Sequence, residues 1–337
     1  MDMSPSWKPC ATPELWRQRM DLIQQIRSFF ASRSILEVES PILSHCMGSD
    51  PQIDYLETRS FVDGPVHNPG EALYLCTSPE FHMKRLLAAG WGDIWQLTRA
   101  FRGGESGARH NPEFSILEWY RVEWDWNALM NEVAELCATL AGNLDGRGAQ
   151  LARSSFMRTT WREAYVRHCG LDPVGASDDA LLECARSQGI SLVGQPSRQV
   201  VLDSLMVLVI EPRLGKRGPE FLTRYPAEQA ALAQVETDAS GWRWARRFEL
   251  YLDGVELANG YQELCDPDEQ ANRFATDLEQ RKEMGKRCPP IDESFLDSLR
   301  HGLPACSGVA LGVDRLVMLL LDKESIADTL TFPIDRA

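Results

Sequence analysis

Two helices are predicted near the start of the chain from the spacing of its apolar residues. Residues 12–14 are Thr, Pro and Glu, which begin helices, and apolar side chains then recur at helical spacing to about Arg33. A short extended run over 35–40 follows. Ser78-Pro79-Glu80 combines an N-cap residue, a first-turn proline and an acid that suits the positive end of the helix dipole. We therefore expect a second helix from Ser78 through Ala89.

Two strands are predicted on either side of a glycine-rich loop. Residues 93–102 and 113–122 have strand-like patterns, and the loop 103–112 between them is too long and polar for a tight hairpin turn. Side chains of a strand alternate between its two faces. One face of the second strand then carries Phe114, Ile116, Glu118 and Tyr120. Because an unpaired buried carboxylate is costly, we expect Glu118 to have a partner.

The rest of the chain favours an α+β fold in a single domain spanning residues 1–337. Residues 247–264 predict a hairpin with Asp253-Gly254 at its turn, and 307–321 predict a strand that runs into a helix. Further helices are expected at 126–144, 177–188, 199–210 and near 269–285. A helical insertion is expected over 126–210. Antiparallel hairpins outnumber βαβ units, which favours an antiparallel sheet flanked by helices.

Charge and composition exclude several classes of protein. The chain has 337 residues, of which 44% are hydrophobic, and a net charge of −14. This acidity gives no general attraction to nucleic acid or anionic membranes, so any phosphate site has to be local. The longest apolar runs span six residues, far short of the roughly 20 that cross a bilayer. No secretory signal is visible, so we expect a cytoplasmic protein.

Metal chemistry based on cysteine or histidine is not favoured. The nine cysteines lie at least fifteen residues apart, which excludes a C-x-x-C pair and a zinc ribbon, and the six histidines form no H-E-x-x-H pair. Reduced, buried cysteines are expected. The chain also lacks a P-loop and a G-x-G-x-x-G motif, so neither of these nucleotide sites is supported.

Arg102 and Arg315 are the candidate anion-binding residues. Arg102 opens the loop 103–112, where an arginine can fork two donors onto a phosphate and glycines let the backbone approach it. Arg315 begins an otherwise apolar helix, a position that disfavours a cation unless an anion is nearby. The alternatives are a solvated surface side chain for Arg102 and an ion pair with Asp314 or another acid for Arg315.

Glu249 and Glu256 are candidate metal ligands. With a two-residue turn, Glu256 lies opposite Tyr251, which places Glu256 and Glu249 on one face of the hairpin. Two acids on one face repel each other unless a cation lies between them, and carboxylate oxygens suit Mg²⁺. Glu263 has the opposite parity, which a bulge at Asn259-Gly260 would correct. The alternative is an acidic edge strand that faces solvent.

Together these stretches resemble the catalytic domain of class II aminoacyl-tRNA synthetases, specifically the lysyl branch. The similar segments are 37–41 at the end of the first helix for motif 1, 101–102 with 109–120 for motif 2, 308–315 for motif 3, and the ELANGYQE segment 256–263. The likeness spans almost the whole chain and is weakest over 145–225. Several long motifs in the right order are far more specific than any one of them.

The subfamily follows from the position of motif 1. Lysyl-tRNA synthetases carry an anticodon-binding domain before the catalytic unit, whereas motif 1 begins here about twenty residues from the start. This shorter form is similar to the elongation factor P lysine ligases, synthetase paralogues that activate (R)-β-lysine with ATP and transfer it to a lysine of elongation factor P. The resemblance implies ATP and Mg²⁺ as cofactors, elongation factor P as the protein substrate, no stable tRNA binding, and a homodimer formed through motif 1.

The resemblance also assigns roles to individual residues. Arg102 and Arg315 would act in catalysis by holding the phosphates of ATP. The residues implied in ATP binding are Arg102, Gly103, Gly104, Asn111, Phe114, Glu256, Leu257, Gly312 and Arg315. Those implied in amino-acid binding are Ser78, Pro79, Glu80, Glu118, Tyr120, Asn259, Glu263 and Ala310. Glu249 and Glu256 would bind Mg²⁺.

The motif 2 loop departs from the family at one place. The family usually has an acid second after the motif 2 arginine, whereas Arg102 is followed by Gly103-Gly104 and then Glu105. Because glycines let the loop bend, we expect Glu105 to take that place.

Three further functions stay open for a chain with these motifs. A free-standing asparagine synthetase is a related truncated form, but Glu118 and Glu263 favour a cationic amino acid. A minimal lysyl-tRNA synthetase would need an affinity for tRNA that the acidic chain does not indicate. A catalytically weakened paralogue would instead act as a regulatory or binding subunit.

Overall fold

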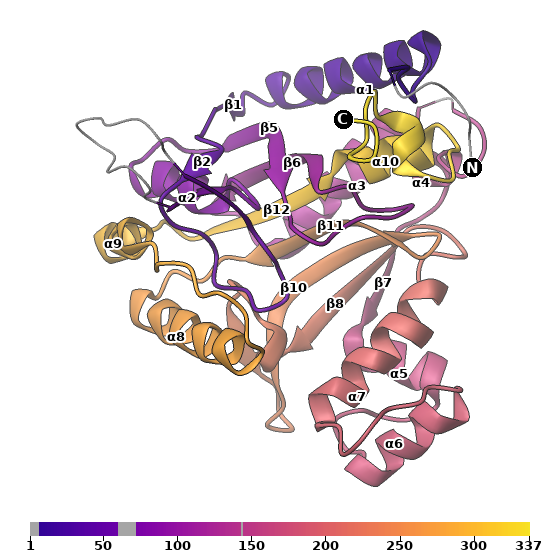
Figure 1. The fold of residues 1–337 in the computed structure, drawn as a ribbon, viewed down its shortest axis with the longest axis vertical. Helices are drawn as coiled ribbons and strands as arrows, with labels where there is room; N and C mark the ends of the chain where they lie inside the picture. Colours follow the sequence, from indigo (N-terminus) through magenta and orange to yellow (C-terminus); the bar gives the residue numbers. More distant parts are fainter. Residues whose placement is uncertain (1–6, 60–71, 143) are drawn as a thin grey trace.

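The fold is built on one large mixed sheet (Figure 1). The computed structural model describes residues 7–59, 72–142 and 144–337. Within these ranges the sheet has nine strands in the order β1-β5-β6-β12-β11-β10-β8-β7, with β9 against β10. These strands are β1 Leu36–Glu37, β5 Ile94–Phe101, β6 Glu113–Val122, β7 Met157–Thr160, β8 Glu220–Pro226, β9 Val235–Thr237, β10 Arg243–Leu252, β11 Val255–Gln262 and β12 Cys306–Gly312. Antiparallel pairs dominate, so the predicted α+β architecture is confirmed.

Helices and a small second sheet surround the large one. The helices are α1 Pro13–Ala31, α2 Glu80–Ala88, α3 Trp126–Ala141, α4 Ala149–Arg153, α5 Trp161–Cys169, α6 Asp178–Ser187, α7 Arg198–Leu205, α8 Pro267–Glu283, α9 Glu293–Gly302 and α10 Val313–Leu320. The small sheet joins β2 Leu43–Ser44, β4 Ala72–Leu75 and β3 Leu56–Arg59. No described helix has the length and hydropathy needed to cross a membrane.

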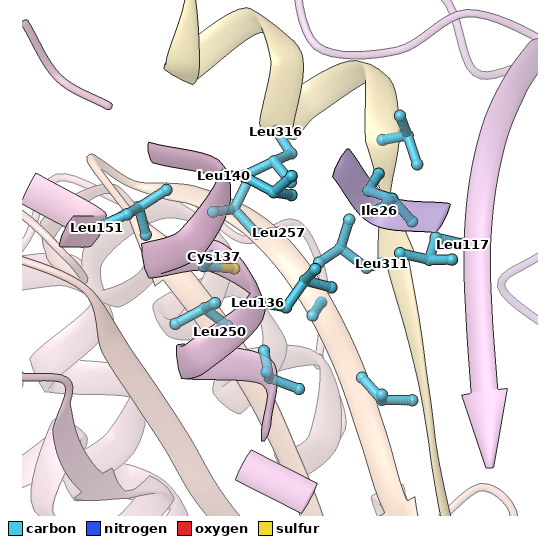
Figure 2. Packing of buried hydrophobic residues seen from close by; sticks show 14 of the residues in the cluster. Ile26, Leu117, Leu136, Cys137, Leu140, Leu151, Leu250, Leu257, Leu311 and Leu316 are labelled. Atoms are coloured by element: carbon cyan, nitrogen blue, oxygen red, sulfur yellow. The ribbon is translucent and has the colours of Figure 1, made fainter. Parts of the chain in front are cut away.

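The main hydrophobic core lies between one face of the sheet and helices α1, α3 and α10. Figure 2 shows part of it, with Ile26 of α1, Leu136 of α3 and Leu316 of α10 near Leu117 and Leu311 of the sheet. Because strand side chains alternate, the neighbours of Leu117 and Leu311 point to the opposite face. Burying one face in this way leaves the other face free to carry polar side chains.

Two further cores flank that opposite face. Helices α5, α6 and α7 form one with β8 and β10, and helices α2, α8 and α9 contribute to the other. Figure 1 shows the α5–α7 group on one side of the sheet and α8 with α9 on the other. The predicted helices at 126–144, 177–188 and 199–210 appear as α3, α6 and α7, the last continued by a π-helical turn, Met206–Ile210.

The insertion expected over 126–210 remains a prediction, as does the single domain. Within that range α3 packs into the main core, whereas α5–α7 pack into their own. Strand β7 also lies within it, and the sequence did not predict this strand. Its four residues are too short a pattern to identify alone, and its pairing partner β8 is about sixty residues further on.

Strand β11 contains a bulge that the sequence analysis placed wrongly. Tyr251 of β10 pairs with Glu256 and Leu250 pairs with Ala258, so the extra residue is Leu257 and not Asn259-Gly260. Both Leu257 and Ala258 point into the main core. The bulge therefore reverses the alternation of side chains between the two sheet faces before residue 259. As a result, Glu256 lies on the same face as the residues at 259, 261 and 263.

Several predicted ends are also corrected. The helix expected from Ser78 begins at Glu80, with Pro79 at its N-cap and no side-chain cap. The Ser78 hydroxyl does accept the Glu80 N–H at 3.0 Å, but it donates to Glu118. The extended run over 35–40 pairs with the sheet only at Leu36–Glu37. All nine cysteines are free, as predicted, but only four of them are buried and the other five are partly exposed.

Candidate active site

A cavity of about 1160 Å³ lies on the sheet face opposite the main core. Residues of α7 and α8 also line it, so it lies between the two flanking cores. The predicted site residues that line it are Ser78, Glu80, Arg102, Asn111, Phe114, Glu118, Tyr120, Glu249, Glu256, Leu257, Asn259, Glu263, Ala310, Gly312 and Arg315. Segments more than two hundred residues apart in the sequence thus form one site.

Three of the predicted site residues do not line the cavity. Pro79 serves as the N-cap of α2. Gly103 donates its N–H to the Asp54 carbonyl at 2.7 Å and so faces the loop before β3. Gly104 has a φ of 75°, and no atom lies within 4 Å of where its side chain would begin. The two glycines shape the loop, and Glu105 lines the cavity.

Glu118 lies at an acidic end of the cavity and has the partners expected of a buried carboxylate. It accepts a hydrogen bond from the Ser78 hydroxyl at 2.9 Å and from the Tyr120 hydroxyl at 2.7 Å. Only 2% of it is exposed. Burial and the nearby Glu80 charge raise the pKa of Glu118 to about 8, against the lowering effect of the two hydrogen bonds. This end of the cavity therefore favours a ligand cation, which would stabilise the ionised form.

Lys84 of α2 is a buried cation behind the acidic end. Its ammonium lies 2.5 Å from Glu80 Oε1 and 2.6 Å from Glu263 Oε2. Burial lowers the pKa of Lys84, but the charges of Glu263 and Glu80 outweigh burial and raise it above its ordinary value. The side chain is 1% exposed and does not line the cavity. Lys84 thus stays protonated and holds two of the cavity's carboxylates in place.

Arg102 lies at the other end of the cavity, at the end of β5. Its guanidinium is 5.2 Å from the centre of the Phe114 ring and 4.0 Å from the Glu105 carboxylate. Its Nε is buried without a hydrogen-bond partner in the described part of the chain, as is the side-chain oxygen of Asn259. Buried polar atoms are nearly always satisfied, so both atoms point to a ligand in the cavity.

Arg315 is held at the same end by contacts from the motif 2 loop and from β11. It donates to the Glu256 carboxylate at 3.2 Å and to the Arg109 carbonyl at 3.2 Å, and it lies 2.6 Å from His110 Nε2. The suggested pair with Asp314 is wrong, because Asp314 pairs with Arg19 of α1 at 2.6 Å and accepts the Ser115 N–H. An acid does compensate Arg315, but the acid is Glu256.

Asn111 has its side chain engaged by the protein itself. The amide nitrogen donates to the Glu113 carbonyl at 2.6 Å, and the amide oxygen accepts the Ile334 N–H at 2.9 Å. Asn111 therefore fastens the motif 2 loop to the end of the chain. A ligand would meet it only through its remaining donor.

The comparison with known proteins identifies the family. A family model described as class II tRNA synthetases (D, K and N) matches residues 11–336. The chain belongs to the class II tRNA synthetase family. It is also 45% identical over 339 aligned positions to proteins named elongation factor P–(R)-β-lysine ligase from Salmonella typhi, Salmonella paratyphi B and Salmonella heidelberg, with the whole of both chains covered. The predicted resemblance is confirmed, and the chain is an ATP-dependent ligase.

The two predicted metal ligands, Glu249 and Glu256, lie close together, but each already contacts other side chains. Glu249 accepts hydrogen bonds from Arg247 at 2.5 Å and from the Tyr251 hydroxyl at 2.6 Å. Burial and Glu249 raise the pKa of Glu256, with Arg315 opposing the rise. Within the described ranges no group of three acid, histidine or cysteine side chains has the spacing to hold a metal. The donor set fits Mg²⁺ that also takes phosphate oxygens, which is how Mg²⁺ usually binds.

Three charged residues of the active site were not predicted from the sequence. Lys84 is a buried cation and Arg247 a partly exposed one, and both pair with predicted acids. Glu211 follows the π-helical turn. Burial and the charges of Glu249 and Glu256 raise the pKa of Glu211 to about 7. Lys84 is four residues after Glu80 on a predicted helix, a spacing that signals an ion pair. Glu211 and Arg247 reach the site only through tertiary packing, and no local pattern marks them.

Proposed function

We propose that this ligase activates (R)-β-lysine with ATP and transfers it to the ε-amine of a lysine on elongation factor P. The proposal draws on the likeness to relatives named for that reaction. The observation that carries it is one cavity with three carboxylates at one end and three arginines at the other. Such a site suits an amino acid with two ammonium groups and a triphosphate.

The reaction needs positioning and charge more than a protein nucleophile. The substrate carboxylate attacks the α-phosphorus of ATP, the bond to pyrophosphate breaks, and an aminoacyl adenylate forms. Arg102 stabilises the charge that develops on the α-phosphate, and Arg315 holds the terminal phosphate. The neutral acceptor amine then attacks the adenylate carbonyl, AMP leaves, and the amine loses its proton as the amide forms.

Other cavity residues hold the two substrates. Phe114 offers an aromatic face to the adenine, with Leu257 and Gly312 beside it. Ser78, Glu80, Glu118, Tyr120, Asn259, Glu263 and Ala310 surround the amino acid. Glu249 and Glu256 would hold Mg²⁺, which would supply neutralisation of the phosphate charge. Gly103, Gly104 and Pro79 lie outside the cavity lining, so they act by shaping the backbone around the site.

The proposal includes a homodimer formed through the motif 1 region. Leu36, Ile42 and Leu43 follow α1 and are exposed apolar residues, each between 41% and 49% accessible. Neighbouring apolar residues that face solvent favour a partner surface. Light scattering of the purified protein measures its mass directly, and a monomer at micromolar concentration contradicts this part of the proposal.

Pyrophosphate exchange with separate amino acids tests the proposed activation step. We expect exchange with (R)-β-lysine to exceed exchange with α-lysine, and aspartate to give none. Mass spectrometry of elongation factor P after incubation with the enzyme, ATP and (R)-β-lysine tests the transfer step. Exchange with aspartate would favour an asparagine synthetase, and an inactive protein would favour a regulatory paralogue.

A further inference from the structure

We propose that Lys84 is a specificity-determining residue that cancels one of the three pocket carboxylates and so matches the pocket to an amino acid with two ammonium groups. The inference rests on the proposed function. It concerns a residue that does not contact the substrate, because Lys84 is buried behind the cavity wall. Lys84 therefore acts through Glu80 and Glu263 as a positioning residue.

The charge count follows from the contacts at the acidic end. Glu80, Glu118 and Glu263 line the cavity, and Lys84 lies within 2.6 Å of two of them. When a bound ligand cation has stabilised the ionised form of Glu118, one ammonium against three carboxylates leaves two formal negative charges. Lysine and β-lysine each carry two ammonium groups, and their carboxylate is the group that reacts. Occupied by such a substrate, the acidic end is electrically balanced.

The packing explains why the charge of Glu263 has to be balanced by another side chain of the protein. The side chains of Lys84 and Glu263 are each 1% exposed, so water cannot screen either charge. Gly308 lets β12 approach so closely that a side chain there would begin 2.5 Å from Glu263 Oε1 and 2.3 Å from the Tyr120 ring. On this tightly packed side Lys84 is the cation next to Glu263. Glu80, at 18% exposed, keeps access to the cavity.

The decisive test compares Glu263→Gln alone with Glu263→Gln combined with Lys84→Met. The single variant leaves one negative charge for two ammonium groups, so we expect the KM for (R)-β-lysine in pyrophosphate exchange to rise at least about tenfold. Adding Lys84→Met restores two negative charges. We expect the double variant to recover most of that loss, because replacing a buried ion pair by neutral side chains is commonly tolerated.

A matched control removes a lysine from an exposed ion pair. Lys216 pairs with Asp253 and is half exposed, so Lys216→Met added to Glu263→Gln should leave the raised KM unchanged. A lysine needed only for packing predicts the opposite pattern, in which Lys84→Met makes Glu263→Gln worse. A double variant with a KM equal to or above that of Glu263→Gln overturns the proposal.

A second measurement needs no substrate. Without Lys84, the neighbouring carboxylates of Glu80 and Glu263 cannot both remain ionised. Lys84→Met should therefore gain, relative to wild type at pH 7.5, an additional infrared carbonyl band of a protonated carboxyl group. Adding Glu263→Gln should remove that band. An unchanged spectrum contradicts the charge role of Lys84. Absence of wild-type exchange with every lysine isomer instead contradicts the proposed function, so the two failures are distinguishable.

Discussion

Glu118, Lys84 and Arg102 show how burial changes what a single charged residue does in this protein. Glu118 and Lys84 are almost fully buried, yet one has a raised pKa and the other stays charged. The difference lies in their partners, since Glu118 has two neutral donors whereas Lys84 has two carboxylates. Arg102 is more exposed and keeps one nitrogen free for a ligand. These differences in environment lead to predictions about single residues.

Glu118→Gln should change how stability depends on pH. In the folded protein the pKa of Glu118 is about 8, against an ordinary value of 4.5. Between these values the folded state keeps a proton that the unfolded chain has lost. The free energy of unfolding contributed by Glu118 therefore falls as pH rises from 4.5 through 8. Glu118→Gln should remove this part of the fall.

Urea unfolding of the ligand-free protein at pH 6 and pH 8.5 measures this effect. Glu283→Gln, at an exposed position near the end of α8, is the control and should keep the wild-type pH dependence. If the free energy of unfolding changes equally between pH 6 and pH 8.5 in Glu118→Gln and wild type, Glu118 is ionised in the folded protein at neutral pH.

Arg102→Ala should slow pyrophosphate exchange by about 10² to 10³, the usual effect of losing one donor to a developing charge. Arg99 lies on the same strand and faces away from the cavity, where it pairs with Glu113 at 3.6 Å. Arg99→Ala is therefore the matched control and should stay within a few-fold of wild type. Comparable losses in both variants would point to damage of β5 instead of a role in catalysis.

Glu105→Ala should weaken the use of ATP by about 1–3 kcal/mol, the cost of leaving a hydrogen-bonding partner unsatisfied. Glu105 lines the cavity, 4.0 Å from both Arg102 and His110. This position supports the expectation that Glu105 takes the place of the acid that the family usually has. The KM for ATP measures the effect. Gly104→Glu should not rescue the loss, because its φ of 75° strains any side chain. Rescue by Gly104→Glu would show that the loop can change its conformation.

Strands β11, β12 and β6 determine the site at the level of secondary-structure elements. The extra residue Leu257 turns Glu256 to the same face as Asn259 and Glu263. In β12, Ala310 pairs with Glu118 on one side and Asn259 on the other, so its methyl group lies among the pocket residues. Small residues in β12 let the neighbouring strands bring their acids together.

Gly308→Ala should destabilise the protein and disturb the amino-acid end of the site. A side chain at 308 would begin 2.3 Å from the Tyr120 ring and 2.5 Å from Glu263, so both have to move. Overpacking of this kind costs about 1–3 kcal/mol. We expect a lower urea midpoint and a higher KM for the amino acid, with the KM for ATP little changed. A variant with a lower midpoint but unchanged KM values would show that the strain is absorbed outside the pocket.

The whole molecule combines a strongly negative charge with a cluster of arginines in the cavity, two of which pair with acids. The net charge is −14, whereas Arg102, Arg109 and Arg315 converge on one end of the cavity. Such a surface attracts a small phosphate ligand locally and a polyanion poorly. Helix α7 contributes lining residues to the same cavity, so distant parts of the chain act on one substrate.

The enzyme should leave purified tRNA(Lys) uncharged while it modifies elongation factor P. The physical reason is the weak attraction between an acidic protein and a phosphate backbone at physiological salt. Acid-precipitable counts after incubation with labelled lysine, ATP and micromolar enzyme measure tRNA charging, with a lysyl-tRNA synthetase as the positive control. Stable aminoacylation would contradict the expectation and favour the minimal synthetase.

The sequence by itself determined the elements that bear local signals and the chemistry along them. Strand alternation placed Phe114, Glu118 and Tyr120 on one face, and the Asp253-Gly254 turn fixed the pairing of Tyr251 with Glu256. The motif arginines and glutamates carried the family resemblance. These features depend on neighbours within a few residues, where spacing and residue type decide the geometry.

Only the tertiary structure decided which distant groups meet. Lys84 pairs with Glu263 across 179 positions of the chain, and Arg19 of α1 pairs with Asp314. Strand β7 joins the sheet through β8, and the bulge lies at Leu257 because the core takes two successive apolar side chains there. A sequence pattern carries no information on such contacts, since only the complete fold brings these segments together and excludes water around them. A buried charge there needs a partner, because leaving it unpaired is costly.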